Sequence, residues 1–400
     1  MSEEAEPTTD QAAIRRTILI LAVCGFASAL STRFVDPMIG VIARDLRADP
    51  LTVALLSTAY ALPYAFIQPI LGPVGDALGK ERIMKFLLAI LAVTLGAASL
   101  TDDLGGLFIF RILSGAAAGA IVPMALATIG DRVTMADRQV AIGRFLTAAI
   151  SGQLLGGVGA GLLAEYIGWR GVFAMAGGLS ALAAIAVFLG FRNARGGGGE
   201  LSFRVAGERY RNILGIPRAR ALMAFVFAEG VIVFGVQPYI APLLEVAKLG
   251  GAREAGLIIG GFAVGGIVYT LLVRWLLTTL GLGRMLKIAG IVAALAFAVL
   301  APALPWTVEM GAMLAMGLGF YMLHNSFQTQ MTEVVSDARA SAVSLHAFAF
   351  FVGQALGPVI FGLLLSSLGR IGAMAACAAG VLAMGFIASV TIGRDQPHGP

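Results

Sequence analysis

Twelve long apolar stretches dominate the chain and limit it to one class of fold. They cover residues 17–43, 51–74, 83–100, 104–129, 141–164, 171–191, 221–244, 255–279, 285–304, 307–331, 341–365 and 371–392. At about 1.5 Å per residue, each stretch can cross about 30 Å of hydrocarbon as a helix. A bilayer core offers the backbone no water, so a spanning segment must satisfy its own hydrogen bonds. The sequence therefore predicts an all-α integral membrane protein with twelve transmembrane helices.

The composition agrees with a membrane protein and argues against other classes. Only 13% of the residues are charged, whereas a soluble domain carries about 25%. The net charge of +5 does not indicate nucleic-acid binding, because the basic residues follow the predicted topology. The two cysteines, Cys24 and Cys377, lie far apart inside apolar stretches. Neither a disulfide framework nor a metal site is expected, and no cofactor is predicted.

Lysine and arginine indicate the orientation of the predicted helices. The N-terminus, the even-numbered loops with the helix ends that flank them, and the C-terminus carry 20 of the 28 basic residues, and the odd-numbered loops carry six. This excess predicts a multi-pass protein of the cell (inner) membrane with both termini in the cytoplasm. The expected order is a tail (1–16), a six-helix bundle (17–191), a linker (192–220), a second bundle (221–392) and a tail (393–400).

The predicted linker, 192–220, contains four consecutive glycines and seven arginines. Glycine-rich segments are flexible, so we expect a flexible cytoplasmic connection between the two bundles. Its arginines are typical of an orientation signal and of contact with anionic membrane lipids.

The two halves of the chain repeat. Residues 152–168 align with 353–369 at an offset of 201, and more than half of the aligned positions are identical. Both segments fall on the fifth predicted helix of their half. A parallel repeat of two halves is one architecture of secondary transporters.

A short charged segment, 72–82, separates the second and third apolar stretches. It resembles the loop after the second helix in the major facilitator superfamily, in which glycines, an aspartate and basic residues recur. The matching positions are Gly72, Asp76, Gly79, Lys80 and, displaced by one residue, Arg82. Ala77 replaces a basic residue of the family pattern. The resemblance implies a cytoplasmic gating loop in which Asp76 meets the eleventh helix.

Glycines of the two repeated segments resemble the superfamily's antiporter motif. The second copy has Gly353, Gly357 and Pro358, whereas the first has Gly152 and Gly156 but a glycine at the position of the proline. The resemblance favours an antiporter. Close packing of helices through small residues explains the same pattern, and the sequence leaves both interpretations open.

Three charged residues lie well inside apolar stretches of the first half, away from their ends. Arg33 and Asp36 are three residues apart, on one face of a helix, and Arg111 lies about two turns into the fourth stretch. In the superfamily the first and fourth helices line a central cavity, so the resemblance implies a contact between Asp36 and Arg111. Ionisable residues in a membrane are costly when unpaired and mark transport pathways. We therefore expect Asp36 to be a titrating group, with Arg33 and Arg111 either tuning it or holding an anionic group of the substrate. A static ion pair is the alternative.

The second half has fewer ionisable candidates. Glu229 lies near the predicted membrane midplane with no basic residue expected beside it, which makes it a candidate proton carrier. His324, Asn325 and Gln328 share one predicted helix and could contact substrate. Polar side chains of this kind also hold helices together, and this interpretation is favoured for His346.

The whole pattern resembles the twelve-helix drug and metabolite:proton antiporters of the superfamily, of the arabinose-efflux-permease type. This resemblance implies proton-coupled export of a small organic solute by a monomer, with protons and a small-molecule substrate as its partners. The sequence contains no phosphate-binding loop or nucleophile motif, so we do not expect an enzyme. Two alternatives are an uptake carrier for an organic anion and a sensor or assembly protein on the same fold.

Overall fold

The computed structural model describes residues 11–133, 135–192, 203–334 and 339–392, and these ranges form helices without strands. The first half contains α1 (Gln11–Arg33), the 3-10 turn η1 (Asp36–Met38), α2 (Ile39–Asp45), α3 (Pro50–Leu78), α4 (Lys80–Ser99), α5 (Leu104–Ala118), α6 (Ile121–Arg132) and α7 (Met135–Gly190). The second half contains α9 (Pro217–Gly235), η2 (Gln237–Tyr239), α10 (Ile240–Ala247), α11 (Ala252–Leu300), α12 (Trp306–Val334) and α13 (Arg339–Thr391). Helix α8 (Phe203–Gly215) lies between the halves along the chain.

Nine helices in the described ranges are long and apolar enough to span a membrane. Three of them, α7, α11 and α13, contain apolar stretches of 51, 49 and 51 residues, or about 75 Å each. Each is broken at one glycine with a positive φ, at Gly168, Gly281 or Gly369. Since 75 Å exceeds twice the hydrocarbon thickness, each of these helices accounts for two crossings. The prediction of an all-α membrane fold is confirmed, and the observed helices are consistent with twelve crossings.

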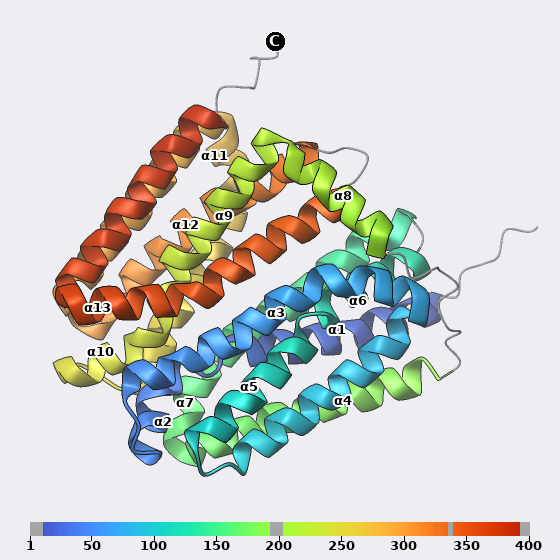
Figure 1. Cartoon of the computed structure of the whole chain (residues 1–400), viewed down its shortest axis with the longest axis horizontal. Helices are drawn as coiled ribbons and strands as arrows, with labels where there is room; N and C mark the ends of the chain where they lie inside the picture. The colour runs from blue at the N-terminus through green and yellow to red at the C-terminus, as the bar shows by residue number, and fades with distance from the viewer. Residues whose placement is uncertain (1–10, 134, 193–202, 335–338, 393–400) are drawn as a thin grey trace, which may run out of the picture.

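Two bundles lie side by side, with α1 to α7 in one and α9 to α13 in the other (Figure 1). Helix α8 lies against α3 and α13 at one end of the molecule, which we call the α8 end. Helices α2 and α10 contact each other at the opposite end, which we call the α2–α10 end.

The first crossing of each bundle is interrupted at the same repeat position. Pro37 lies in η1 and Pro238 lies in η2, again 201 residues apart. Proline lacks a backbone N–H group and disfavours a helical residue before it, so each helix tightens into a 3-10 turn there. The two turns contact each other between the bundles.

Glycines bring the first and fifth crossings of the N-terminal bundle into close contact. A Cβ atom at Gly152 would lie 2.3 Å from the Phe26 carbonyl oxygen, and one at Gly156 would lie 2.4 Å from the Leu30 carbonyl oxygen. Such distances exclude any larger residue unless a backbone moves. Helices α1 and α7 therefore pack backbone to backbone.

The C-terminal bundle repeats this contact at the same offset. A Cβ atom at Gly353 would lie 2.2 Å from the Phe227 carbonyl oxygen, and one at Gly357 would lie 2.7 Å from that of Val231. The carbonyl oxygen of Pro358, inside α13, accepts a hydrogen bond from Tyr239 Oη at 2.7 Å. The sequence repeat therefore encodes one helix contact twice.

Two expectations about connections are wrong. The segment 72–82 is not an extended loop, because α3 continues to Leu78 and α4 starts at Lys80, which leaves Gly79 alone at the turn. Gly79 has φ +92°, a conformation that glycine adopts without strain. The linker, for which no regular structure is expected, also contains a helix, α8 (Phe203–Gly215). Residues 193–202, with the four glycines, lie outside the described residues.

The bundles meet closely at the α2–α10 end. Arg44 of α2 forms an ion pair with Glu245 of α10, and these two residues are also 201 apart. A Cβ atom at Gly161 of α7 would lie 2.4 Å from the Ala252 carbonyl oxygen and 2.9 Å from the Gly256 Cα atom of α11. This conformation is thus closed at the α2–α10 end by backbone contact between the bundles.

Replacing Gly161 with valine should open the α2–α10 end, because the new side chain overlaps the α11 backbone. Spin labels at Asp102 and Val246, in a background without the two native cysteines, report the separation of the bundles by electron paramagnetic resonance. We expect a longer distance in Gly161→Val. Gly159→Val is the matched control, because nothing lies within 4 Å of a Cβ atom there. Equal distances in both variants would contradict the closure described here.

Candidate functional site

A buried ion pair occupies the break in the first crossing. Arg33 Nη1 lies 3.3 Å from Asp36 Oδ2, and the two residues are 5% and 1% exposed. The second carboxylate oxygen accepts a hydrogen bond from Ser57 Oγ of α3. Arg33 Nη2 donates to Gln354 Oε1 of α13, so this arginine joins the two bundles.

Arg111 of α5 is fully buried but has no carboxylate partner in the described structure. Its Nη1 donates to the Ser31 carbonyl oxygen at 3.1 Å, and its Nε donates to the Leu56 carbonyl oxygen at 3.3 Å. Its guanidinium lies 4.1 Å from the centre of the Tyr60 ring. The predicted contact between Arg111 and Asp36 is therefore wrong in this conformation, because backbone carbonyls and an aromatic face compensate the cation instead.

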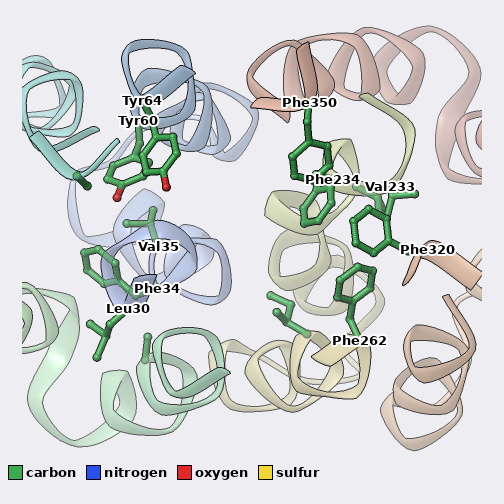
Figure 2. Packing of buried hydrophobic residues seen from close by; sticks show 14 of the residues in the cluster. Leu30, Phe34, Val35, Tyr60, Tyr64, Val233, Phe234, Phe262, Phe320 and Phe350 are labelled. Atoms are coloured by element: carbon green, nitrogen blue, oxygen red, sulfur yellow. The ribbon is translucent and has the colours of Figure 1, made fainter. Parts of the chain in front are cut away.

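Arg33 also stacks on the opposite bundle. Its guanidinium carbon lies 4.4 Å from the centre of the Phe234 ring. Phe234 packs edge-on against Phe320 and Phe350, with ring centres 5.2 and 5.5 Å away. Figure 2 shows this aromatic cluster together with Phe262. Since Arg33 and Phe234 are 201 residues apart, equivalent positions of the two halves face each other here.

Glu229 has a basic partner, contrary to the expectation from sequence. His324 Nδ1 lies 2.8 Å from Glu229 Oε2, and Glu229 is completely buried. The other carboxylate oxygen, Oε1, has no hydrogen-bond partner in the described structure. The His324 ring lies 4.5 Å from the Phe350 ring, which places the pair against the aromatic cluster.

The other polar residues predicted in the second half do not join this pair. Asn325 lines a separate cavity of about 420 Å³ within the C-terminal bundle, together with Tyr269 and Glu333. Gln328, one turn beyond His324, is exposed. His346 is buried with its ring centre 5.4 Å from that of His324, and neither of its nitrogens has a partner in the described structure.

A second cavity lies between the bundles. Arg33 and Gln153 line it from the N-terminal bundle, and Phe234, Gln237 and Tyr321 line it from the other bundle. It is thus in contact with the ion pair of one bundle and with the aromatic cluster of the other. Among the described residues, no group of three His, Cys, Asp or Glu side chains could hold a metal ion.

The predicted gating residues lie at the α8 end. Lys80 Nζ forms an ion pair with Asp131 at 2.6 Å, and Glu81 forms one with Arg132 at 2.8 Å, so α4 is tied to α6. Arg82 is exposed. The surroundings of Gly72 and Asp76 lie outside what the structure describes.

Sequence reasoning missed the residues that connect the two bundles. Gln354 binds Arg33, Ser57 binds Asp36, and Phe234 stacks on Arg33. The repeat offset carried a usable signal, because Gln153 and Gln354 are equivalent positions directly after aligned glycines. Ser57 had no comparable signal.

The substitution Asp36→Asn should destabilise the protein by about 3–5 kcal/mol, because it leaves the buried Arg33 cation without its carboxylate. The double variant Arg33→Gln/Asp36→Asn should recover most of this loss. Denaturant titration in mixed micelles measures the free energy of unfolding. Asp102→Asn, which breaks a pair whose aspartate is 92% exposed, is the control and should change little. An equal effect of Asp36→Asn and Asp102→Asn would contradict the role given to the buried pair.

Comparison with known sequences gives one family. The model of the Major Facilitator Superfamily matches residues 21–358. The uncharacterised MFS-type transporter YwfA of Bacillus subtilis is 25% identical over 382 residues, which are 93% of this chain and 90% of YwfA. MdtD of Salmonella paratyphi B, whose name describes a multidrug resistance protein, is 28% identical over 177 residues, or 44% of this chain. The match spans only 37% of MdtD.

Solved structures share the fold. The nucleoside transporter NupG superimposes with a TM-score of 0.77 at 15% identity, covering 94% of this chain and 99% of NupG. A bacterial homologue of the human lysosomal transporter Spinster, solved in an inward-facing and unoccupied conformation, gives 0.74 at 19% identity over 99% of this chain and all of that one. The two helical bundles, their internal repeat and the family match over most of the sequence agree: this chain belongs to the Major Facilitator Superfamily.

Proposed function

We propose that this protein exports a small organic solute across the cell membrane in exchange for protons, by alternating access between its two bundles. The main support for this proposal is the buried contact between Glu229 and His324, in which one carboxylate oxygen of Glu229 has no hydrogen-bond partner in the described structure. An ionised carboxylate in an apolar interior is costly, whereas a protonated one needs only a hydrogen bond. Glu229 takes up a proton in one state of the cycle and releases it when water reaches it in the other.

Coupling between proton and solute runs through the aromatic cluster. His324 contacts Glu229, Phe350 contacts His324, and Phe234 contacts both Phe350 and the Arg33 guanidinium. A change of charge at Glu229 moves His324 and therefore the packing of these rings. The rings in turn form part of the wall of the cavity between the bundles, where the solute binds. Through the same contacts, solute binding in turn changes the protonation equilibrium of the Glu229 carboxyl group.

The charged junction at the α8 end acts as the gate of that end. Lys80 and Glu81 hold α4 against α6, so the gate moves as part of the N-terminal bundle. Asp76 binds the start of α13 in the state that is closed there. Since Asp76 lies on the cytoplasmic side of the proposed topology, this gate controls access from the cytoplasm.

An uptake carrier for an organic anion is the second candidate, favoured by the buried Arg33 and Arg111 cations. The direction of solute movement under an imposed pH gradient separates uptake from export. In proteoliposomes, solute that moves against the inward proton flow supports export, and solute that moves with it supports uptake.

The substitution Glu229→Gln should abolish pH-driven accumulation of substrate, because glutamine mimics the protonated carboxyl group permanently. Exchange of substrate without a pH gradient should continue. Flux into proteoliposomes, with and without a pH gradient, measures both. The control is Glu309→Gln, which removes another buried carboxylate of the same bundle, paired with Arg370 and away from the proposed path. Accumulation against the substrate gradient in Glu229→Gln would rule out the coupling role.

A further inference from the structure

The side chains that line the cavity between the bundles indicate the chemistry of the substrate. This inference rests on the proposed function, in which the solute binds in that cavity. Two of the residues that line it each carry a donor without an acceptor. Arg33 Nε and Gln237 Nε2 are buried and have no hydrogen-bond partner in the described structure, while the residues are 5% and 2% exposed. A buried donor left without an acceptor is destabilising, so a ligand that supplies acceptors gains affinity here.

The two donors come from equivalent turns of the two bundles. Arg33 precedes η1, and Gln237 begins η2, the equivalent turn of the other bundle. Because these turns contact each other between the bundles, a single acceptor group in the cavity can reach side chains from both. The nitrogens Nη1 and Nη2 of Arg33 are already engaged by Asp36 and Gln354, so the orientation of the guanidinium is fixed.

The charge of the wall favours an anion. Arg33 is the only charged side chain that lines this cavity in the part of the chain described by the structure. Asp36 compensates it through Nη1, but a second buried cation of the same bundle, Arg111, binds the Ser31 and Leu56 carbonyl oxygens and forms no ion pair of its own in the described structure. Two cations and one carboxylate leave a positive balance, which attracts a negative group. An amine would instead enter without an acidic partner on the wall.

The rest of the wall is apolar and aromatic. Phe234 and Phe262 contribute ring surfaces, Tyr321 adds a third ring, and Ile150 and Ile259 close the sides. Aromatic walls favour flat apolar groups. We propose that the substrate is an organic anion with a planar apolar body, whose carboxylate accepts hydrogen bonds from Arg33 Nε and Gln237 Nε2.

Binding to the purified full-length protein in detergent tests this proposal without any proton gradient. The probes are benzoate, 2-naphthoate and indole-3-acetate, each with its matched primary amide and amine, measured by calorimetry. We expect at least one carboxylate to bind, with its amide and amine at least tenfold weaker. Equal or tighter binding of an amide or amine, or binding of none of the carboxylates, would overturn the proposal.

Variants locate the carboxylate. Gln237→Leu leaves the ion pair of Arg33 intact and should weaken carboxylate binding about tenfold, since a hydrogen bond to a charged group is lost. Arg33→Gln/Asp36→Asn removes both charges together, so a buried ion is not left alone, and should weaken it further. Gln68→Leu, in α3 and outside the cavity wall, is the control. Unchanged binding in Gln237→Leu and in the double variant would also overturn the proposal.

The result of this binding experiment is independent of the result of the proton-coupling experiment. Carboxylate binding without pH-driven flux would reject the proposed coupling and keep this inference. Proton-driven transport of an amine would do the reverse.

Discussion

The close approach of two helix backbones occurs once in each bundle, and the arrangement of the residues between the bundles depends on it. Glycines of α7 lie against carbonyl oxygens of α1, and glycines of α13 lie against carbonyl oxygens of α9. In a membrane, where apolar burial gives no advantage over lipid, such close packing is a main source of helix association. The contacts fix the first crossing of each bundle. They thereby bring Arg33 next to Phe234, and Arg44 next to Glu245, across the line between the bundles.

The two bundles have diverged most where they face each other. The repeat places Arg33 and Asp36 opposite Phe234 and Gln237, so one bundle carries an ion pair where the other carries a ring and an amide. The C-terminal bundle has its own buried acid, Glu229, paired with His324 rather than with an arginine. The guanidinium of arginine stays charged at physiological pH, whereas a carboxyl group beside a histidine can exchange a proton. We infer that the N-terminal bundle supplies the fixed charge and the C-terminal bundle supplies the titrating group.

Much of this arrangement is predictable from the sequence, and the predictions that are wrong have physical causes. Apolar length alone predicts the crossings, and the glycines at 152, 156, 353 and 357 predict close packing. Contacts between helices that are distant in sequence are harder to predict. A helical span places side chains on every face, and the sequence does not show which face meets which helix. Arg111 was therefore assigned to Asp36, although carbonyl oxygens and Tyr60 surround it. For the same reason the sequence does not show that His324, itself a candidate site residue, contacts Glu229.

The prediction of a loop over residues 72–82 is wrong for a different reason. Charged residues near a membrane surface were interpreted as a loop, yet a helix can continue into water, and only Gly79 breaks it. Charge therefore indicates where a helix leaves the hydrocarbon but not where it ends.

The proposed transport cycle depends on one step, the exchange of a proton by the Glu229 carboxyl group. Difference infrared spectroscopy of the protein in lipid bilayers, across pH steps, observes the C=O stretch of a protonated carboxyl group directly. We expect a band that changes over the pH range in which transport depends on pH, and that is absent in Glu229→Gln. A band that persists unchanged in Glu229→Gln, or no titrating carboxyl in that range, would contradict it.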